Sequence, residues 1–213
     1  MSVTIKKVIN QVAYICFVAS ISLLLCEGVV RVYSWFFFPK MMKIDPALGW
    51  SHTANAQKHF TNEEQTILIV QNAVGHRGPD YGLQKAEGKN RVLFLGDSFT
   101  EGSHVGEESL FSNIIGNSYP NLEVMNAGVG GYGSVQEYIY LQREGLKFQP
   151  DLVFLLFFEN DLLDNCLSFT PGIGPRPYAT MQNGQLEIHE KISSQEWQKY
   201  ALPFPFAAKL NQY

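Results

Sequence analysis

The stretch of sequence that decides the fold is RVLFLGDSF, residues 91–99. It contains a continuous apolar run without the alternation of a half-exposed strand, which predicts a buried strand. A second strand at Leu122–Met125 and a third at Leu152–Phe158, which is seven consecutive apolar residues, follow at intervals of about 30 residues, the length of a βαβ unit. Apolar residues at helical spacing lie between the runs, over 110–115 and 135–146. We therefore predict a three-layer α/β sandwich whose parallel sheet is covered by helices on both faces.

Each predicted strand ends in residues that can act on a ligand. Ser98 follows the first strand, the glycine-rich loop 128–133 follows the second, and Asn160 follows the third. Because right-handed crossovers make parallel strands run the same way, their carboxyl ends share one edge of the sheet. We therefore expect these three groups to converge. The Ser98 hydroxyl could attack a carbonyl beside backbone N–H groups, and a serine that only caps a helix is the alternative.

The glycine loop also contains a formal G-x-G-x-x-G pattern at Gly128, Gly130 and Gly133. A dinucleotide site would need an acidic residue at the end of the next strand, about 20 residues further on. Asp151 lies at the start of that strand, which is the wrong edge of the sheet. We therefore reject a dinucleotide site and expect neither a cofactor nor a metal.

Three blocks of the sequence together resemble a known enzyme family. The segments GDSFTEG at 96–102, NAGVGGYG at 126–133 and Asn160-Asp161 are similar, in this order, to the first three conserved blocks of SGNH (GDSL-type) serine hydrolases. Upstream, Asn72, Gly75 and Arg77 resemble a segment of membrane-anchored bacterial members. The resemblance implies a flavodoxin-like α/β fold.

The same resemblance implies the roles of individual residues. It makes Ser98 the nucleophile, and its own N–H, the Gly131 N–H and the Asn160 side chain would form the oxyanion hole. Glu159 stands where many members have glycine. A carboxylate at that position would hinder oxyanion formation electrostatically unless it points away from the site.

The catalytic base of the family has no counterpart in this sequence. Members carry an Asp-x-x-His block near the C-terminus, and no aspartate here has a histidine three residues later. His104 has the spacing with Glu101, but it follows Ser98 so closely that it would need a tight loop to reach the hydroxyl. For the other histidines we expect surface positions, namely His52, His59, His76 and His189. The final family block usually lies beyond residue 213, so a truncated product or fragment is the simplest expectation.

An apolar run of 19 residues without formal charge, Val8–Cys26, begins after Lys6-Lys7. As a helix it would cover roughly 28 Å, close to the thickness of a bilayer's hydrocarbon core. Glu27 and Arg31, spaced i,i+4, would continue this helix, and the aromatic residues 35–38 suit a headgroup layer. The run ends without the small residues of a cleavage site. We expect a retained single-pass anchor with the rest of the chain outside the cytoplasm, and a cleaved signal peptide or a buried helix are the alternatives.

These features divide the 213 residues into three parts. We expect an anchor over 1–38, a loop-rich lead-in over 39–90 and the α/β domain over 91–213, with a hairpin around Asn183-Gly184. The net charge of −4 shows no basic footprint for nucleic acid. Three cysteines, two of them in the apolar run, predict no disulfide framework.

The resulting functional hypothesis is ester or acyl chemistry through an acyl-serine intermediate. The substrate would be a small-molecule, lipid or envelope-polysaccharide ester, and hydrolysis and acyl transfer share the machinery. A non-catalytic anchored module that binds a glycan or an acyl group is the alternative. Because the base is missing, we expect little or no hydrolase activity from the chain as it stands.

Overall fold

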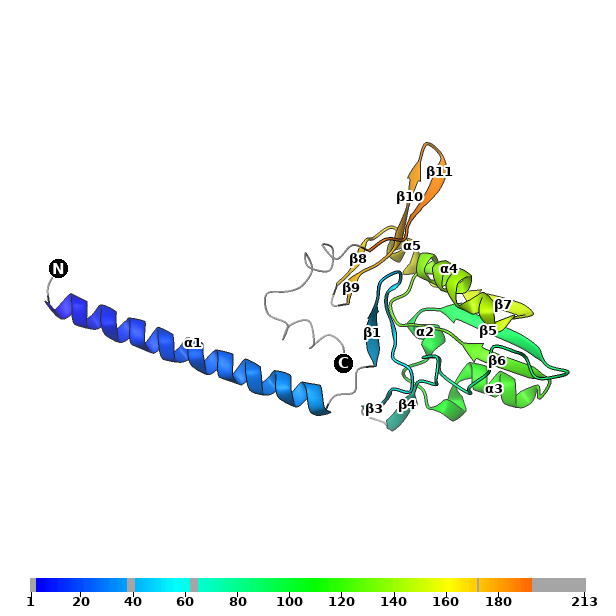
Figure 1. The fold of residues 1–213 in the computed structure, drawn as a ribbon, viewed down its shortest axis with the longest axis horizontal. Coiled ribbons are helices and arrows are strands. Elements are labelled where there is room, and N and C mark those ends of the chain that lie inside the picture. Colours follow the sequence, from blue (N-terminus) through cyan, green and yellow to red (C-terminus); the bar gives the residue numbers. More distant parts are fainter. Residues whose placement is uncertain (1–2, 38–40, 62–64, 172, 193–213) are drawn as a thin grey trace. The chain divides into compact units, whose positions relative to one another are not determined.

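The computed structural model describes residues 3–37, 41–61, 65–171 and 173–192 (Figure 1). The chain forms two compact units, Met1–Pro39 and Lys40–Tyr213. In chain order the elements are α1 (Val3–Phe37), β1 (Met42–Asp45), β2 (Gly49–His52), β3 (Gln57–Thr61), β4 (Thr66–Val70), β5 (Asn90–Gly96), α2 (Ser98–Glu101), η1 (Glu107–Ser109), α3 (Phe111–Ser118), β6 (Leu122–Asn126), α4 (Ser134–Arg143), η2 (Gly145–Phe148), β7 (Leu152–Leu156), α5 (Asp161–Asp164), β8 (Phe169–Thr170), β9 (Gly174–Pro175), β10 (Tyr178–Gln182) and β11 (Gln185–His189).

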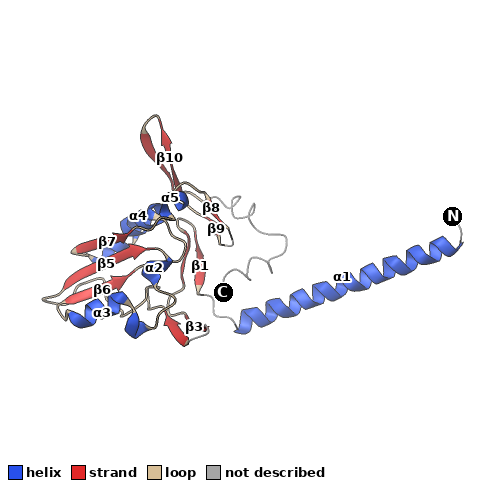
Figure 2. Cartoon of the chain, turned by 180° about the vertical axis from the view of Figure 1, so that it is seen from behind, coloured by secondary structure: helices blue, strands red, loops and turns tan. Residues whose placement is uncertain are grey.

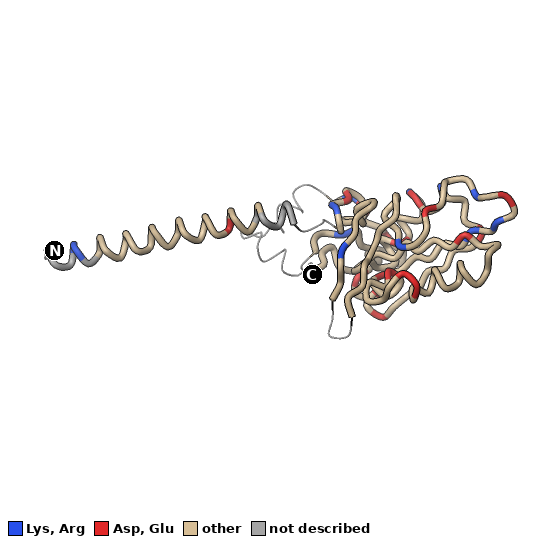
Figure 3. Tube along the Cα trace, turned by 90° about the horizontal axis from the view of Figure 1, so that it is seen from below, with Lys and Arg blue, Asp and Glu red and all other residues tan. Residues whose placement is uncertain are grey.

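The first unit is the helix α1, which continues past Glu27 as expected and ends at Phe37. Its 22 residues Ile9–Val30 are long and apolar enough to cross a membrane, and other parts of the described chain do not bury them. Figure 3 shows that the helix carries no charged residue between Lys7 and Glu27. A membrane span and an N-terminal signal sequence both have these properties.

The second unit is built on a parallel sheet with the strand order β6-β5-β7. In the register of β5, Val92 pairs with Val124 on one side and with Leu152 on the other. The three predicted strands are thus the three strands of the sheet. The third strand is shorter than its run, because β7 ends at Leu156.

Helices cover both faces of this sheet. Alternate side chains of β5 point to opposite faces, where each set packs against a different helix. Val92 and Phe94 lie in the core cluster that packs against α3. Leu93 and Leu95 lie in the cluster that packs against α4 and η2. The two helices flank the strands in Figure 2. The predicted three-layer α/β sandwich is therefore confirmed.

The strand β7 departs from the expected burial. Four of its five residues are exposed, whereas β5 is buried from Arg91 to Gly96. The apolar composition of this run predicted helices over both faces, and that expectation is wrong for β7. An edge position alone does not explain this difference, because β6 lies at the other edge of the sheet and is buried. Of the β7 residues, Val153 packs against a core cluster, whereas the other four are exposed within the described chain.

The lead-in contains two antiparallel hairpins, β1-β2 and β3-β4. The strand predicted at Thr66–Val70 is β4. Leu48 and Trp50 belong to the same core cluster as Tyr132 and Ile139 of the α/β domain. The lead-in therefore shares a hydrophobic core with the glycine-rich loop and α4 of the α/β domain.

The predicted hairpin near the C-terminus is β10-β11. Its turn residues Asn183 and Gly184 have φ of 52° and 77°. Positive φ at both central residues is the conformation that favours an Asn-Gly pair in a two-residue hairpin turn. The sequence beyond residue 192 lies outside the described part of the chain.

The loop after α2 is held by a buried arginine from the lead-in. Arg77 is 2% exposed, and its guanidinium donates to the carbonyls of Glu101, Gly102 and Val105 and to the Glu107 carboxylate (2.6 Å). The backbone of the lead-in segment that carries Arg77 is itself fixed by a hydrogen bond, since Asn72 Oδ1 accepts from the His76 N–H (2.9 Å). This segment thus supports the loop that follows Ser98.

We expect Arg77→Met to lower the free energy of unfolding by about 3–5 kcal/mol, because it removes the buried cation that donates to several backbone carbonyls and to the Glu107 carboxylate. Lys147→Met is the matched control. Lys147 is exposed and pairs with Glu144 at 2.8 Å, a surface ion pair that contributes less than about 1 kcal/mol. The measurement is urea unfolding of the full chain in detergent micelles. Equal losses for the two variants would contradict the structural role of Arg77.

Candidate active site

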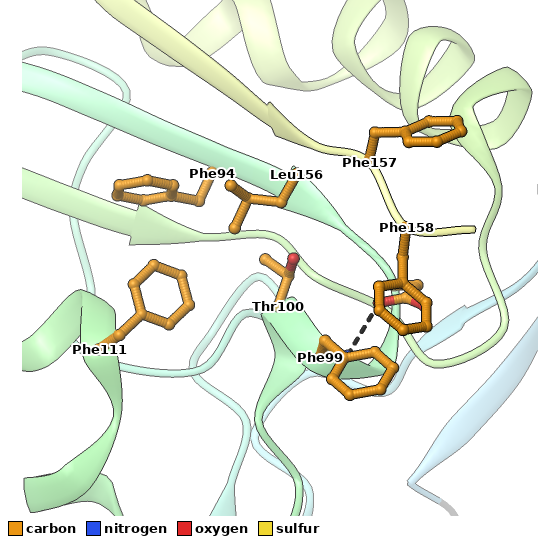
Figure 4. Close-up of a pocket in the computed structure, with 8 residues that line it drawn as sticks. Phe94, Phe99, Thr100, Phe111, Leu156, Phe157 and Phe158 are labelled. Carbon is orange, nitrogen blue, oxygen red and sulfur yellow. Dashed lines mark hydrogen bonds between the residues drawn. The ribbon is translucent and has the colours of Figure 1, made fainter. Parts of the chain in front are cut away.

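Ser98 lies at the carboxyl edge of the sheet, directly after β5. The strand ends at Gly96, and Asp97 caps α2 by accepting the Phe99 N–H at 2.9 Å, the bond dashed in Figure 4. Ser98 is therefore the first helical residue, and it is half-buried. Its hydroxyl makes no hydrogen bond with any residue that the structure describes.

The glycine loop after β6 is attached to the end of β5. Ala127 N–H donates to the Phe94 carbonyl (2.9 Å), and Val129 N–H donates to the Gly96 carbonyl (3.0 Å). A Cβ at Gly128 would lie 2.3 Å from the Glu101 backbone nitrogen, so only glycine permits this approach. The loop thereby lies directly against the start of α2.

This approach brings the tip of the loop to Ser98. A Cβ at Gly130 would lie 3.8 Å from the Ser98 Cβ. The next residue, Gly131, has φ of +77°, and its N–H donates to no group within the described ranges. The Gly131 N–H, which has no partner in the described ranges, therefore belongs to the residue directly after Gly130, the glycine that lies next to Ser98.

Asn160 follows β7 and precedes α5. The ring of Phe158 lies 4.2 Å from the ring of Phe99, which brings this loop to the segment that carries Ser98. The Asn160 side-chain amide donates to Asp164 Oδ2 at 2.9 Å, and Arg176 donates to Asp164 Oδ1 at 2.7 Å. One amide hydrogen of Asn160 is thus used, and an amide has a second one to donate.

Sequence reasoning missed the role of Glu101. It is 7% exposed; its Oε2 accepts from Gly130 N–H at 2.8 Å, and its Oε1 lies 3.3 Å from His52 Nε2. Burial raises the pKa of Glu101, but the contact with His52 and the Gly130 N–H outweigh it, so the pKa is lowered. Glu101 therefore links the lead-in to the glycine loop.

Two of the histidine predictions are wrong. His52 and His76, expected at the surface, are each 4% exposed because the lead-in folds back onto the domain. His52 Nδ1 lies 3.0 Å from the Gly75 carbonyl. His76 Nε2 lies 2.5 Å from the Tyr140 hydroxyl, and burial, followed by the charge of His52, lowers its pKa to about 3.

The remaining histidines are closer to expectation. His59 and His104 are exposed, and the His104 ring packs edge-on against Phe60 with centroids 4.9 Å apart. His189 is half-buried, with its Nε2 2.8 Å from Thr180 Oγ1. All five histidines of the chain lie in described ranges, and none of them makes a hydrogen bond to Ser98.

The unusual Glu159 is exposed to solvent. Water and salt screen an exposed carboxylate strongly, so its repulsion of a developing oxyanion is weak. The position is therefore compatible with an anionic intermediate nearby.

Buried acidic residues lie below this edge of the sheet. Neither carboxylate oxygen of Glu137 in α4 has a hydrogen-bond partner in the described chain. Burial, followed by the charges of Asp161 and Asp97, raises the pKa of Glu137 to about 8, against a smaller opposing effect of Arg176. Ser134 donates to Asp161 Oδ2 at 3.0 Å.

Within the ranges described, no three or more His, Cys, Asp or Glu side chains are grouped so that they could hold a metal ion.

An open apolar pocket of about 380 Å³ adjoins the serine segment (Figure 4). Asp97 and Phe99, the residues on either side of Ser98, line it. The other lining residues come from β5, α2, α3 and the end of β7, and they are Phe94, Thr100, Phe111, Leu156, Phe157 and Phe158.

We expect the contribution of Glu137 to the stability of the protein to fall as pH rises from about 4.5 to 8, since the folded state holds the Glu137 proton more tightly than the unfolded state does. Glu137→Gln stays neutral, so it should raise the free energy of unfolding at pH 8 by on the order of 3 kcal/mol and leave it unchanged at pH 4. Thermal unfolding at the two pH values measures this difference. Glu144→Gln, an exposed carboxyl beside the same helix, is the control and should change stability little at either pH.

The sequence of the α/β domain is similar to a known protein family. Residues 92–193 match the family described as GDSL-like Lipase/Acylhydrolase, a range that begins in β5 and ends after β11. No curated protein matches the chain. Residues 92–193 are therefore similar to the GDSL-like lipase/acylhydrolase family, which supports hydrolysis of ester bonds at the level of the family.

Proposed function

We propose that Ser98 attacks the carbonyl carbon of an ester on a lipid or an envelope polysaccharide. The observation that carries this proposal is the approach of the glycine loop to the serine. A Cβ at Gly130 would lie 3.8 Å from the Ser98 Cβ, and the adjoining Gly131 N–H has no partner among the described residues. A free donor beside a serine hydroxyl is the arrangement that stabilises a tetrahedral oxyanion.

The reaction has two steps. The Ser98 oxygen bonds to the carbonyl carbon and gives its proton to solvent water, while the carbonyl oxygen becomes an oxyanion that accepts from Gly131 N–H and the Asn160 amide. The C–O bond of the ester then breaks, and the leaving alcohol takes up a proton. Attack by water on the acyl-serine completes hydrolysis, and attack by a second hydroxyl completes acyl transfer.

One feature supports the binding of the acyl group, and another supports the orientation of the Asn160 amide as the second oxyanion donor. The aromatic pocket beside Asp97 and Phe99 suits an apolar acyl group. Arg176 holds Asp164, which holds the Asn160 amide, so the side-chain nitrogen of Asn160 is fixed by charge-assisted hydrogen bonds.

A second candidate function is a non-catalytic module that binds an acyl or glycan group in the same site. The positions of the histidines favour it, because none of them bonds to the Ser98 hydroxyl. Without a general base, a serine at ordinary pKa is a weak nucleophile. The two candidates differ in whether ester turnover depends on Ser98.

We expect slow turnover of a short-chain aryl ester by the full chain in detergent micelles. The oxyanion donors alone typically leave a rate about 10³–10⁴-fold above the uncatalysed reaction. Ser98→Ala should lower this rate, because it removes the nucleophile but keeps the Gly131 and Asn160 donors, and His104→Ala should not change it. Equal rates for the wild type and Ser98→Ala would support the binding module. Fast turnover abolished by both substitutions would make His104 the base.

We also propose that α1 is a retained single-pass anchor and that the α/β domain lies outside the cytoplasm. The support is the uncharged apolar span of α1, which lacks a small-residue cleavage motif at Leu23–Cys26. Protease added to intact spheroplasts should digest the domain and leave a short membrane-bound fragment. Full protection, or a mature N-terminus near Glu27, would contradict this topology.

A further inference from the structure

The tip of the glycine loop is a tight turn whose central peptide joins two glycines. Tyr132 N–H donates to the Val129 carbonyl at 3.0 Å, which closes a four-residue turn, and Gly131 has the positive φ of the third residue in a type II turn. Type I and type II turns differ by a rotation of this central peptide through about 180°. With glycine on both sides, neither orientation is excluded by a side chain.

The orientation of this peptide decides where the Gly131 N–H points. In a planar trans peptide the N–H is antiparallel to the preceding carbonyl. The Gly130 carbonyl accepts from Trp50 Nε1 at 3.0 Å, so the Gly131 N–H points away from the indole. A rotated peptide would turn this donor toward Trp50.

The indole that makes this hydrogen bond is itself held in place. Trp50 is 3% exposed in β2, its carbonyl accepts from the Tyr132 hydroxyl at 2.6 Å, and its ring packs edge-on against that of Tyr132. The Arg176 guanidinium lies 5.6 Å from the indole centroid. On the other side of Gly130, Glu101 accepts its N–H at 2.8 Å, so both peptides that flank Gly130 are fixed.

We propose that Trp50 is a positioning residue, whose indole N–H locks the Gly130–Gly131 peptide so that the Gly131 N–H is available as an oxyanion donor. The oxyanion role rests on the function proposed above, whereas the locking of the peptide does not. Trp50 lies outside the range 92–193 that matches the family, so the lead-in supplies a residue that prepares the site. Such preorganisation matters because a donor that must first reorient stabilises the transition state less.

The sequence offers a direct test, because Gly130-Gly131 is its only Gly-Gly pair. In protein labelled with ¹³C-carbonyl glycine and ¹⁵N glycine, the only amide coupled to a labelled carbonyl is therefore that of Gly131. The full chain in micelles should show one sharp resonance. In Trp50→Phe, which keeps an aromatic ring but removes the donor, the resonance should split or broaden. A split resonance in the wild type, or an unchanged single resonance in Trp50→Phe, would overturn the proposal.

Tyr132→Phe is the matched control, since it removes a hydrogen bond between the same strand and loop but leaves the Trp50–Gly130 bond. Its Gly131 resonance should stay single. In the ester assay, Trp50→Phe should lower kcat roughly 10- to 100-fold with little change in KM. Peptide rotation without a loss of kcat would refute the positioning role. If the wild type turns over no faster than Ser98→Ala, the proposed function fails, and the resonance still decides whether Trp50 locks the peptide.

Discussion

The parallel pairing of β5 with β6 on one side and β7 on the other is the constraint on which the site depends. Phe94 pairs with Asn126 and Gly96 pairs with Leu156, so the three strands end at nearly the same level. The loops that follow must therefore leave from one edge. Reversing any single strand would send its loop to the opposite edge and separate the serine from one of its expected donors.

Beyond this constraint, much of the local support comes from the lead-in. The family match starts at residue 92, yet Trp50, His52 and Arg77 contact the loops that carry the candidate site. Backbone loops without such contacts would have several accessible conformations, especially where glycines are adjacent. Hydrogen bonds from buried side chains remove that freedom before a substrate arrives, which is the condition for effective electrostatic stabilisation.

Charge is concentrated beneath the same edge. Arg176 is 2% exposed, and it donates to Asp164, Thr170 and the Gln136 side chain. Glu137 lies near this cation, but the pKa of about 8 shows that burial and neighbouring carboxylates dominate its environment. A buried arginine with several acceptors orients its partners firmly, whereas a buried carboxyl without donors tends to keep its proton. The carboxyl edge of the sheet thus combines the fixed donors of Arg176 with the Glu137 carboxyl, which keeps its proton at neutral pH.

The sequence by itself determined the three strands, the two main helices, the hairpin at Asn183-Gly184 and the loops that carry Ser98, Gly131 and Asn160. These features follow from local periodicity and from the few residues that suit a given turn, so a single chain segment encodes each of them. Only the tertiary structure decided the burial of His52 and His76, the bonding of Glu101 and Trp50 to Gly130, and the exposure of β7. These outcomes depend on which distant segments pack together, and local patterns of polarity do not contain that information.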